Sequence, residues 1–293
     1  MGPLHLNQDP DVPRHVTVGG VRIPALVYGT AWKEERTASL VRAALEAGFR
    51  GIDTANQRKH YHEAAVGEAV HGALRAGALA RDDLFLQTKF TFVRGQDARL
   101  PYDPRATVAE QVEQSCASSL EHLGVERIDA YLLHGPSGPT GLATQDWEAW
   151  SAMEGLHRAG KTRLLGVSNV SAAQLEELHD GASVKPSVVQ SRTLVWPRAD
   201  LATRTFCSER GLVYEGFSLL TAAPQLLTHA AVRAAAARTG RTPAEVVLQF
   251  WLEEGMVVLS GTTSREHMRQ DLSLDRTALL DAERRSIRAV LGA

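Results

Sequence analysis

Residues 84–90, Leu-Phe-Leu-Gln-Thr-Lys-Phe, form a short run of apolar and β-favouring residues that ends near a lysine. The segments on both sides, residues 63–75 and 106–123, repeat their apolar residues with the 3.6-residue period of a helix. A short strand between two helical segments is typical of parallel βα units. This stretch therefore predicts a parallel sheet covered by helices.

The same alternation continues in both directions along the chain. The short apolar runs are residues 25–29, 50–54, 84–90, 130–134, 163–168, 187–191, 213–217 and 257–261. Segments with helical periodicity include residues 37–47, 63–75, 106–123, 146–159, 172–179, 230–238 and 244–253. Eight strand and helix pairs in 293 residues predict an α/β fold, a (β/α)8 TIM barrel in a single domain.

The N-terminal segment predicts a β-hairpin. Residues 15–18 and 21–24 alternate around Gly19-Gly20, and we expect this hairpin to close the bottom of the barrel. Residues 1–13 are expected to form a disordered extension. No linker rich in Ser, Pro or Gly divides the rest, so residues 14–293 are assigned to the barrel.

Composition excludes several classes of partner. A balance of 32 Lys+Arg against 34 Asp+Glu gives no bulk reason to expect nucleic acid. No apolar run approaches the roughly 18 residues of a membrane span, and the first residues lack the features of a secretory signal. The two cysteines, Cys116 and Cys207, form no C-x-x-C pair. We therefore expect a soluble, cytoplasmic monomer without a membrane or nucleic-acid partner.

Polar residues at the ends of the predicted strands attract functional interest, because the chemistry of such barrels sits at the C-terminal ends of the strands. Asp53, Lys89, His134 and Gln190 lie at four of these ends. The lysine is the most informative, since the chain has 27 arginines and only five lysines.

Sequence motifs that recur in order along nearly the whole chain indicate a family. They are I-P-A-L at 23–26 with G-T at 29–30, D-T-A at 53–55, Q-T-K at 87–89, Y-L-L-H at 131–134, G-V-S-N at 166–169 and G-F-S-L-L at 216–220. Together they resemble the aldo-keto reductase family. The resemblance implies an enzyme that reduces a small carbonyl compound, an aldehyde or ketone, with a nicotinamide cofactor.

Carried over residue by residue, the resemblance implies a catalytic tetrad of Asp53, Tyr61, Lys89 and His134. A free phenol has a pKa near 10, and a lysine about 4 Å away is worth roughly 4 kcal/mol, or about 3 pKa units. We therefore expect Lys89 to bring the Tyr61 phenol near neutrality, Asp53 to hold the lysine, and His134 to bind the substrate carbonyl. The long spacing after Asp53 leaves His60 as the alternative to Tyr61.

The cofactor is implied by resemblance, because no G-x-G-x-x-G follows a strand. The implied cofactor-binding residues are Gly29, Thr30, Ala31, Asp53, Ser168, Asn169, Gln190, Phe217, Ser218, Leu219, Leu220, Gly261, Thr262, Thr263, His267, Gln270 and Asp271. Phe217 replaces the usual tyrosine beneath the nicotinamide. Gly261 and His267 stand where many NADP-binding members carry Lys and Arg, so bonds to the 2′-phosphate are expected from Arg265, Arg269 or the backbone N–H groups near Thr262 and Thr263. We expect NADPH, with NADH also accepted.

The substrate pocket is outlined by the remaining residues. Trp32, Phe92 and Trp196 are expected to form an apolar wall near Tyr61 and His134. Gly135 stands where members of the family often have tryptophan, and the chain stops soon after its last helical segment, where many members carry a covering loop. An open pocket for bulky carbonyl substrates is therefore expected.

Two other functions are retained. The first is a reductase-like barrel that binds a cofactor or a partner without turnover. The second is a metal-dependent barrel hydrolase, suggested by His60, His62 and Glu63 near Asp53, since paired histidines often ligate zinc.

Overall fold

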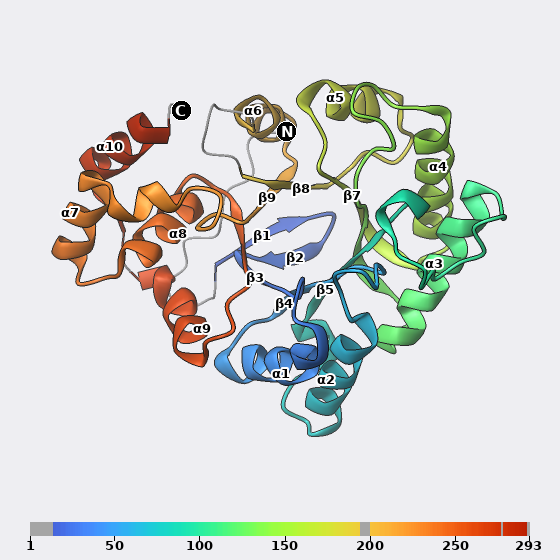
Figure 1. The fold of residues 1–293 in the computed structure, drawn as a ribbon, viewed down its shortest axis with the longest axis horizontal. Coiled ribbons are helices and arrows are strands. Elements are labelled where there is room, and N and C mark those ends of the chain that lie inside the picture. The colour runs from blue at the N-terminus through green and yellow to red at the C-terminus, as the bar shows by residue number, and fades with distance from the viewer. Residues whose placement is uncertain (1–13, 194–199, 277, 292–293) are drawn as a thin grey trace.

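The structure, a computed structural model, describes residues 14–193, 200–276 and 278–291. In this part of the chain eight parallel strands close into a barrel, in which each strand pairs with the next and β10 closes against β3 (Figure 1). The strands are β3 (Leu26–Gly29), β4 (Gly51–Asp53), β5 (Phe85–Phe90), β6 (Ile128–Leu133), β7 (Thr162–Ser168), β8 (Val188–Arg192), β9 (Val213–Phe217) and β10 (Val257–Ser260). The predicted (β/α)8 barrel is confirmed, although His134 and Gly261 lie one residue beyond their strands.

Helices surround the barrel (Figure 1). They are α1 (Thr37–Ala47), α2 (Glu63–Arg75), α3 (Val108–Leu123), α4 (Thr144–Arg158), α5 (Ala172–Gly181), α6 (Leu201–Arg210), α7 (Ala230–Thr239), α8 (Pro243–Glu253), α9 (Arg265–Leu272) and α10 (Asp281–Leu291). Periodicity did not single out α6 or α9. The reason is a thin apolar stripe, since α6 buries only Thr203 and Cys207, and α9 only Met268 and Asp271.

The helix boundaries follow from capping residues. Thr107 is the N-cap residue directly before α3. Its side chain accepts from the Glu110 N–H at 3.3 Å, and the Glu110 carboxylate accepts from the Thr107 N–H at 2.8 Å. Thr242 and Glu245 form the same reciprocal pair at the start of α8, with Pro243 at the first helical position. These pairs satisfy N–H groups that a helix start otherwise leaves open.

The hairpin closes the barrel at the end opposite to the polar strand ends. Strands β1 (His15–Val18) and β2 (Val21–Pro24) pair antiparallel, and Gly19 and Gly20 turn between them with φ of 53° and 72°. Val16, Val21 and Ile23 are buried among the apolar side chains of the barrel interior. The predicted closure of the bottom is confirmed. The expected disorder of residues 1–13 lies outside the described residues.

None of the helices in residues 14–193, 200–276 and 278–291 has the length and apolar character needed to cross a membrane.

Candidate active site

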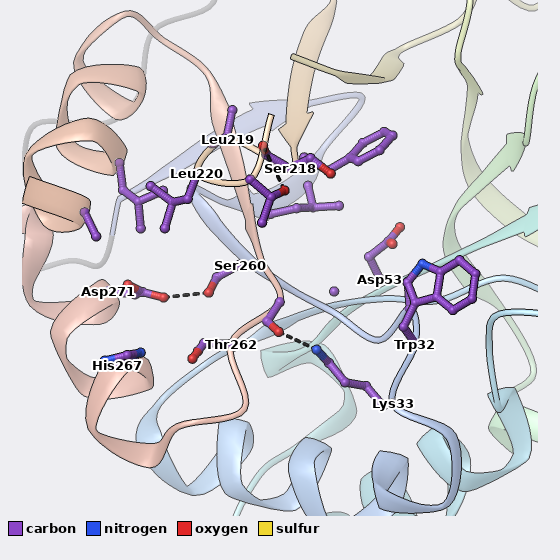
Figure 2. Close-up of a pocket in the computed structure, with 18 of the residues that line it drawn as sticks. Trp32, Lys33, Asp53, Ser218, Leu219, Leu220, Ser260, Thr262, His267 and Asp271 are labelled. Atoms are coloured by element: carbon purple, nitrogen blue, oxygen red, sulfur yellow. Dashed lines mark hydrogen bonds between the residues drawn. The ribbon is translucent and has the colours of Figure 1, made fainter. Parts of the chain in front are cut away.

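A cavity of about 920 Å³ opens at the C-terminal ends of the strands. Its volume lies within the range of ligand-binding pockets, roughly 300 to 1,000 Å³. Figure 2 shows it between the loop that carries Trp32 and Lys33, the turn after β9, and helix α9. The residues predicted from the sequence that line it are Gly29, Ala31, Trp32, Asp53, Tyr61, His134, Ser168, Asn169, Gln190, Phe217, Ser218, Leu219, Leu220, Gly261, Thr262, His267, Gln270 and Asp271.

Other predicted site residues lie away from this lining. The Thr30 hydroxyl is buried and donates to the Asp53 carbonyl at 2.9 Å. Gly135 and Thr263 are not part of the cavity wall. Trp196 lies outside the described residues.

The prediction that Phe92 forms part of the pocket wall is wrong. Its ring packs edge-to-face on Phe90 with centroids 5.2 Å apart, within the hydrophobic core. The short helix η3 (Val93–Gly95) begins directly after it and turns the chain away from the strand direction. The prediction extended the direction of β5 beyond its last residue, Phe90, and so placed the Phe92 ring in the pocket wall.

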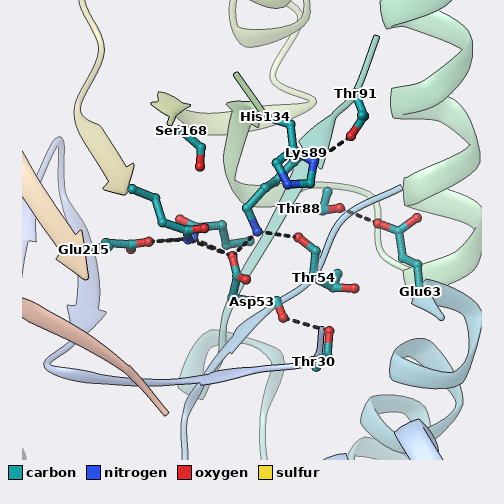
Figure 3. A network of polar contacts seen from close by, with 12 residues as sticks. Thr30, Asp53, Thr54, Glu63, Thr88, Lys89, Thr91, His134, Ser168 and Glu215 are labelled. Atoms are coloured by element: carbon teal, nitrogen blue, oxygen red, sulfur yellow. Dashed lines mark hydrogen bonds and ion pairs between the residues drawn. The ribbon is translucent and has the colours of Figure 1, made fainter. Parts of the chain in front are cut away.

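A buried ion pair lies beneath the cavity. Lys89 Nζ donates to Asp53 Oδ1 at 2.6 Å and to the Thr54 carbonyl at 2.9 Å (Figure 3). Burial is the largest single influence and lowers the pKa of Lys89, but the charge and hydrogen bond of Asp53, together with Tyr61 and Glu215, outweigh it and leave this pKa above its ordinary value. Lys89 therefore carries its positive charge at neutral pH.

Tyr61 lies on the loop after β4, in front of this pair. The centre of its ring is 5.4 Å from Lys89 Nζ and 5.9 Å from the centre of the His134 ring. His60 also lines the cavity, but its ring lies against Trp32, with the ring centres 3.9 Å apart and the planes tilted by 36°. The structure thus brings Tyr61, and not His60, to the lysine.

The expected near-neutral pKa of the Tyr61 phenol is not found. Burial raises this pKa above its ordinary value, Lys89 lowers it in part, and Asp53 raises it again. Desolvation of the phenolate outweighs one ammonium whose charge is shared with a carboxylate. The phenol therefore holds its proton at neutral pH, which is the form a proton donor needs.

His134 follows β6 and is held by a neighbour that the sequence analysis missed. Its Nδ1 lies 2.6 Å from Thr91 Oγ1. Burial lowers the pKa of His134 to about 3, with further lowering by Lys89 and His60. The imidazole is therefore neutral, with one N–H donor and one acceptor nitrogen.

Ser168 ends β7 and Asn169 follows it, and neither side chain is used as a helix cap. Helix α5 is capped instead by Ser171. The Asn169 amide donates to the His134 carbonyl at 3.0 Å and to Ser168 Oγ at 3.1 Å, on a backbone with φ of 53°. Asparagine tolerates this left-handed conformation better than most residues.

The positively charged side chain that the structure places beside the end of β10 is Lys33, which the sequence analysis did not predict. Arg265 forms an exposed ion pair with Glu46 at 2.7 Å. Lys33, only 7% exposed, donates from Nζ to the Gly261 carbonyl, and a Cβ at Gly261 would lie 3.7 Å from this nitrogen (Figure 2). Burial, and then Arg36, lower the pKa of Lys33. Its only signal in the sequence was its place three residues after Thr30.

The metal-site hypothesis finds no support in the geometry. Among the described residues, no group of three or more His, Cys, Asp or Glu could hold a metal ion. Glu63 bonds to His122 Nδ1 at 3.1 Å and accepts from Thr88, while Asp53 pairs with Lys89. The two carboxylates that the metal hypothesis combines with His60 and His62 therefore bind other side chains in this structure.

A (β/α)8 barrel that brings Tyr61, Lys89, Asp53 and His134 together at one mouth is the arrangement expected of an oxidoreductase that acts on carbonyl compounds. The sequence model of the Aldo/keto reductase family matches residues 17–291, and the chain belongs to this family. It is similar to an aldo-keto reductase of Mycolicibacterium vanbaalenii, with 34% identity over 80% of this chain and 76% of the relative. It is also similar to deoxymugineic acid synthase 1 of Oryza sativa, with 31% identity over 92% and 87%. The crystal structure of an aldo/keto reductase from Brucella melitensis superimposes with a TM-score of 0.78 at 26% identity, covering 99% of this chain and all of that one (100%).

Proposed function

We propose that the protein reduces an aldehyde or ketone to an alcohol with NADPH, and that Tyr61 supplies the proton. The observation that carries this proposal is the arrangement of Tyr61, Lys89 and His134 around one end of a large cavity. We further propose that the enzyme is a cytoplasmic monomer. Its substrates would be small-molecule carbonyl compounds, including bulky ones.

The residues along the cavity fit a nicotinamide dinucleotide. Ser168, Asn169 and Gln190 offer hydrogen-bonding side chains, and Phe217 offers an aromatic ring near them. Lys33 is a buried ammonium with no carboxylate within ion-pair distance among the described residues. Because an uncompensated buried charge is costly, Lys33 favours an anionic ligand such as a phosphate. When bound, the dinucleotide would supply the hydride for the carbonyl carbon.

The chain's own residues handle the proton. The Tyr61 phenol gives its proton to the carbonyl oxygen as the hydride adds to the carbon, so that an alcohol forms. Lys89 stabilises the phenolate that remains, and Asp53 keeps the lysine charged and oriented. In the tautomer in which the Thr91 hydroxyl donates to Nδ1, neutral His134 carries its proton on Nε2 and donates to the substrate oxygen.

A direct test compares NADPH and NADH. Each is titrated against the protein by fluorescence, and a set of aldehydes and ketones is then screened for oxidation of the cofactor. Carbonyl-dependent oxidation of NADPH supports the proposal. Tight binding of NADPH without turnover of any carbonyl would favour the cofactor-binding subunit instead.

Thr91→Val should lower kcat about five- to tenfold. Valine keeps the shape of threonine but removes the hydroxyl that holds His134 Nδ1, a hydrogen bond worth about 1 kcal/mol. Steady-state rates with one aldehyde measure the effect. Thr91→Ser is the matched control, because it keeps the hydroxyl, and it should stay near the wild-type rate. A fully active Thr91→Val would contradict this role.

Gly135→Trp should reduce kcat/KM for bulky ketones more than for small aldehydes, by about tenfold in the ratio. A Cβ at this position meets only ordinary contacts, 3.5 Å from the Ser168 carbonyl and 3.6 Å from the Asn169 Cβ, so the backbone accepts a side chain. The indole then narrows the region beside His134. Equal losses for large and small substrates would count against an open pocket.

A further inference from the structure

Four buried side chains meet across the barrel interior just below the cavity. They are Asp53 of β4, Gln87 of β5, Gln190 of β8 and Glu215 of β9. Figure 3 shows Asp53 and Glu215 on opposite sides of this polar layer, joined by dashed contacts. Glu215 is fully buried, and neither the sequence analysis nor the proposed proton transfer gives it a role.

Both amides donate to both carboxylates. Gln190 Nε2 lies 3.0 Å from Asp53 Oδ1 and 2.8 Å from Glu215 Oε2. Gln87 Nε2 lies 2.9 Å and 2.7 Å from the same two atoms. Since an amide nitrogen has two N–H bonds, both N–H groups of each glutamine are donated, one to Asp53 and one to Glu215.

This pattern fixes the orientation of the Gln190 amide. If the amide turned over, its carbonyl oxygen would face two carboxylate oxygens, and two acceptors would meet without a proton between them. Asp53 alone holds only one N–H, whereas Glu215 holds the second and so sets the plane of the amide. Because Gln190 also lines the cavity, its oxygen is the amide atom left for a ligand.

We propose that Glu215 is a positioning residue that locks the Gln190 amide so that its oxygen accepts a hydrogen bond from the carboxamide NH2 of the cofactor. This inference rests on the proposed function, because it requires a nicotinamide at this end of the cavity. The ligand chemistry it selects is a primary amide.

The protonation of Glu215 is compatible with the lock. Burial raises its pKa to about 7, the charge of Asp53 adds to this, and the two glutamine amides oppose it. Glu215 Oε1 has no hydrogen-bond partner among the described residues, so a proton can reside there. Oε2 then remains an acceptor for both amides in either form.

The test measures the preference for NADPH over its 3-acetylpyridine analogue, in which a methyl group replaces the amide NH2. Calorimetric Kd values should show a preference of about tenfold in the wild-type protein, equal to about 1.4 kcal/mol. In Glu215→Leu this preference should fall to less than twofold. Glu215→Gln, whose amide oxygen can still accept from both neighbours, should keep most of it.

Three controls separate positioning from general damage. Glu215→Leu leaves one buried N–H of each glutamine without its acceptor and should unfold earlier than wild type, so a thermal scan checks that this variant is folded at the temperature of the titrations. In a Gln190→Leu background, Glu215→Leu should change the preference no further. Glu63→Gln removes another buried carboxyl that does not contact Gln190, and it should leave the preference intact.

The outcomes are distinct. A tenfold preference that survives in Glu215→Leu, or a wild-type protein that binds both compounds equally, overturns the lock while NADPH binding still supports the proposed function. A wild-type protein that binds neither compound overturns the proposed function and the lock together.

Discussion

Tyr61→Phe should lower kcat for carbonyl reduction by about a hundredfold or more. The substitution removes one hydroxyl in front of Lys89 and leaves the ring, so packing against His134 is kept. Cofactor Kd should change little, because the phenol acts on the substrate oxygen. Single-turnover rates and fluorescence titrations separate the two quantities.

The pH profile provides a second measure of the same residue. Burial holds the pKa of Tyr61 above its ordinary value and that of His134 at about 3, so neither group titrates between about pH 6 and about pH 9. The reduction rate should therefore be flat over this interval. His60→Ala is the control and should remain active, since the His60 ring lies against Trp32, whereas the Tyr61 ring is the one placed beside Lys89. An inactive His60→Ala beside an active Tyr61→Phe would reverse the assignment.

Lys33→Met should raise the Kd of NADPH about ten- to a hundredfold. The ammonium lies at the Gly261 carbonyl, beside the position from which the resemblance implies a phosphate-binding lysine, and a charged hydrogen bond is worth about 1.5 to 3 kcal/mol. The Kd of NADH, which lacks the 2′-phosphate, should rise less than threefold. Parallel fluorescence titrations provide both values.

Arg265→Met is the matched control for this measurement. Arg265 forms a surface ion pair with Glu46, so its loss should leave both dissociation constants within about twofold. If Lys33→Met weakens NADPH and NADH equally, the ammonium faces the pyrophosphate that both cofactors share. If neither changes, Lys33 has no ligand phosphate.

Strand order and the main site were accessible from the sequence because both depend on local patterns. The buried strands are continuous apolar runs, and a lysine inside such a run, as at Lys89, is unusual enough to be noticed. Helix α6 was missed because only Thr203 and Cys207 face the core, which leaves no apolar period to detect. Local pattern therefore predicts an element only when that element buries an apolar face.

Contacts between distant strands could not be predicted in the same way. Glu215 meets Gln87 from across the barrel, 128 residues away in sequence. Thr91 bonds to His134, which is 43 residues away in sequence. After β5 the chain leaves the strand direction, and Phe92 therefore packs in the core beside Phe90. The prediction of a near-neutral pKa for Tyr61 was wrong for a related reason. It considered only the pairwise interaction with Lys89 and omitted the desolvation caused by burial in the fold.

The hairpin of β1 and β2 also decides how molecules travel through the protein. Val16, Val21 and Ile23 fill the lower end of the barrel, so within the described ranges of the chain its axis is closed at that end. Whatever enters the cavity must leave by the same mouth. A compound seated deepest in it is therefore the first to arrive and the last to depart, and a second compound bound above it delays its exit.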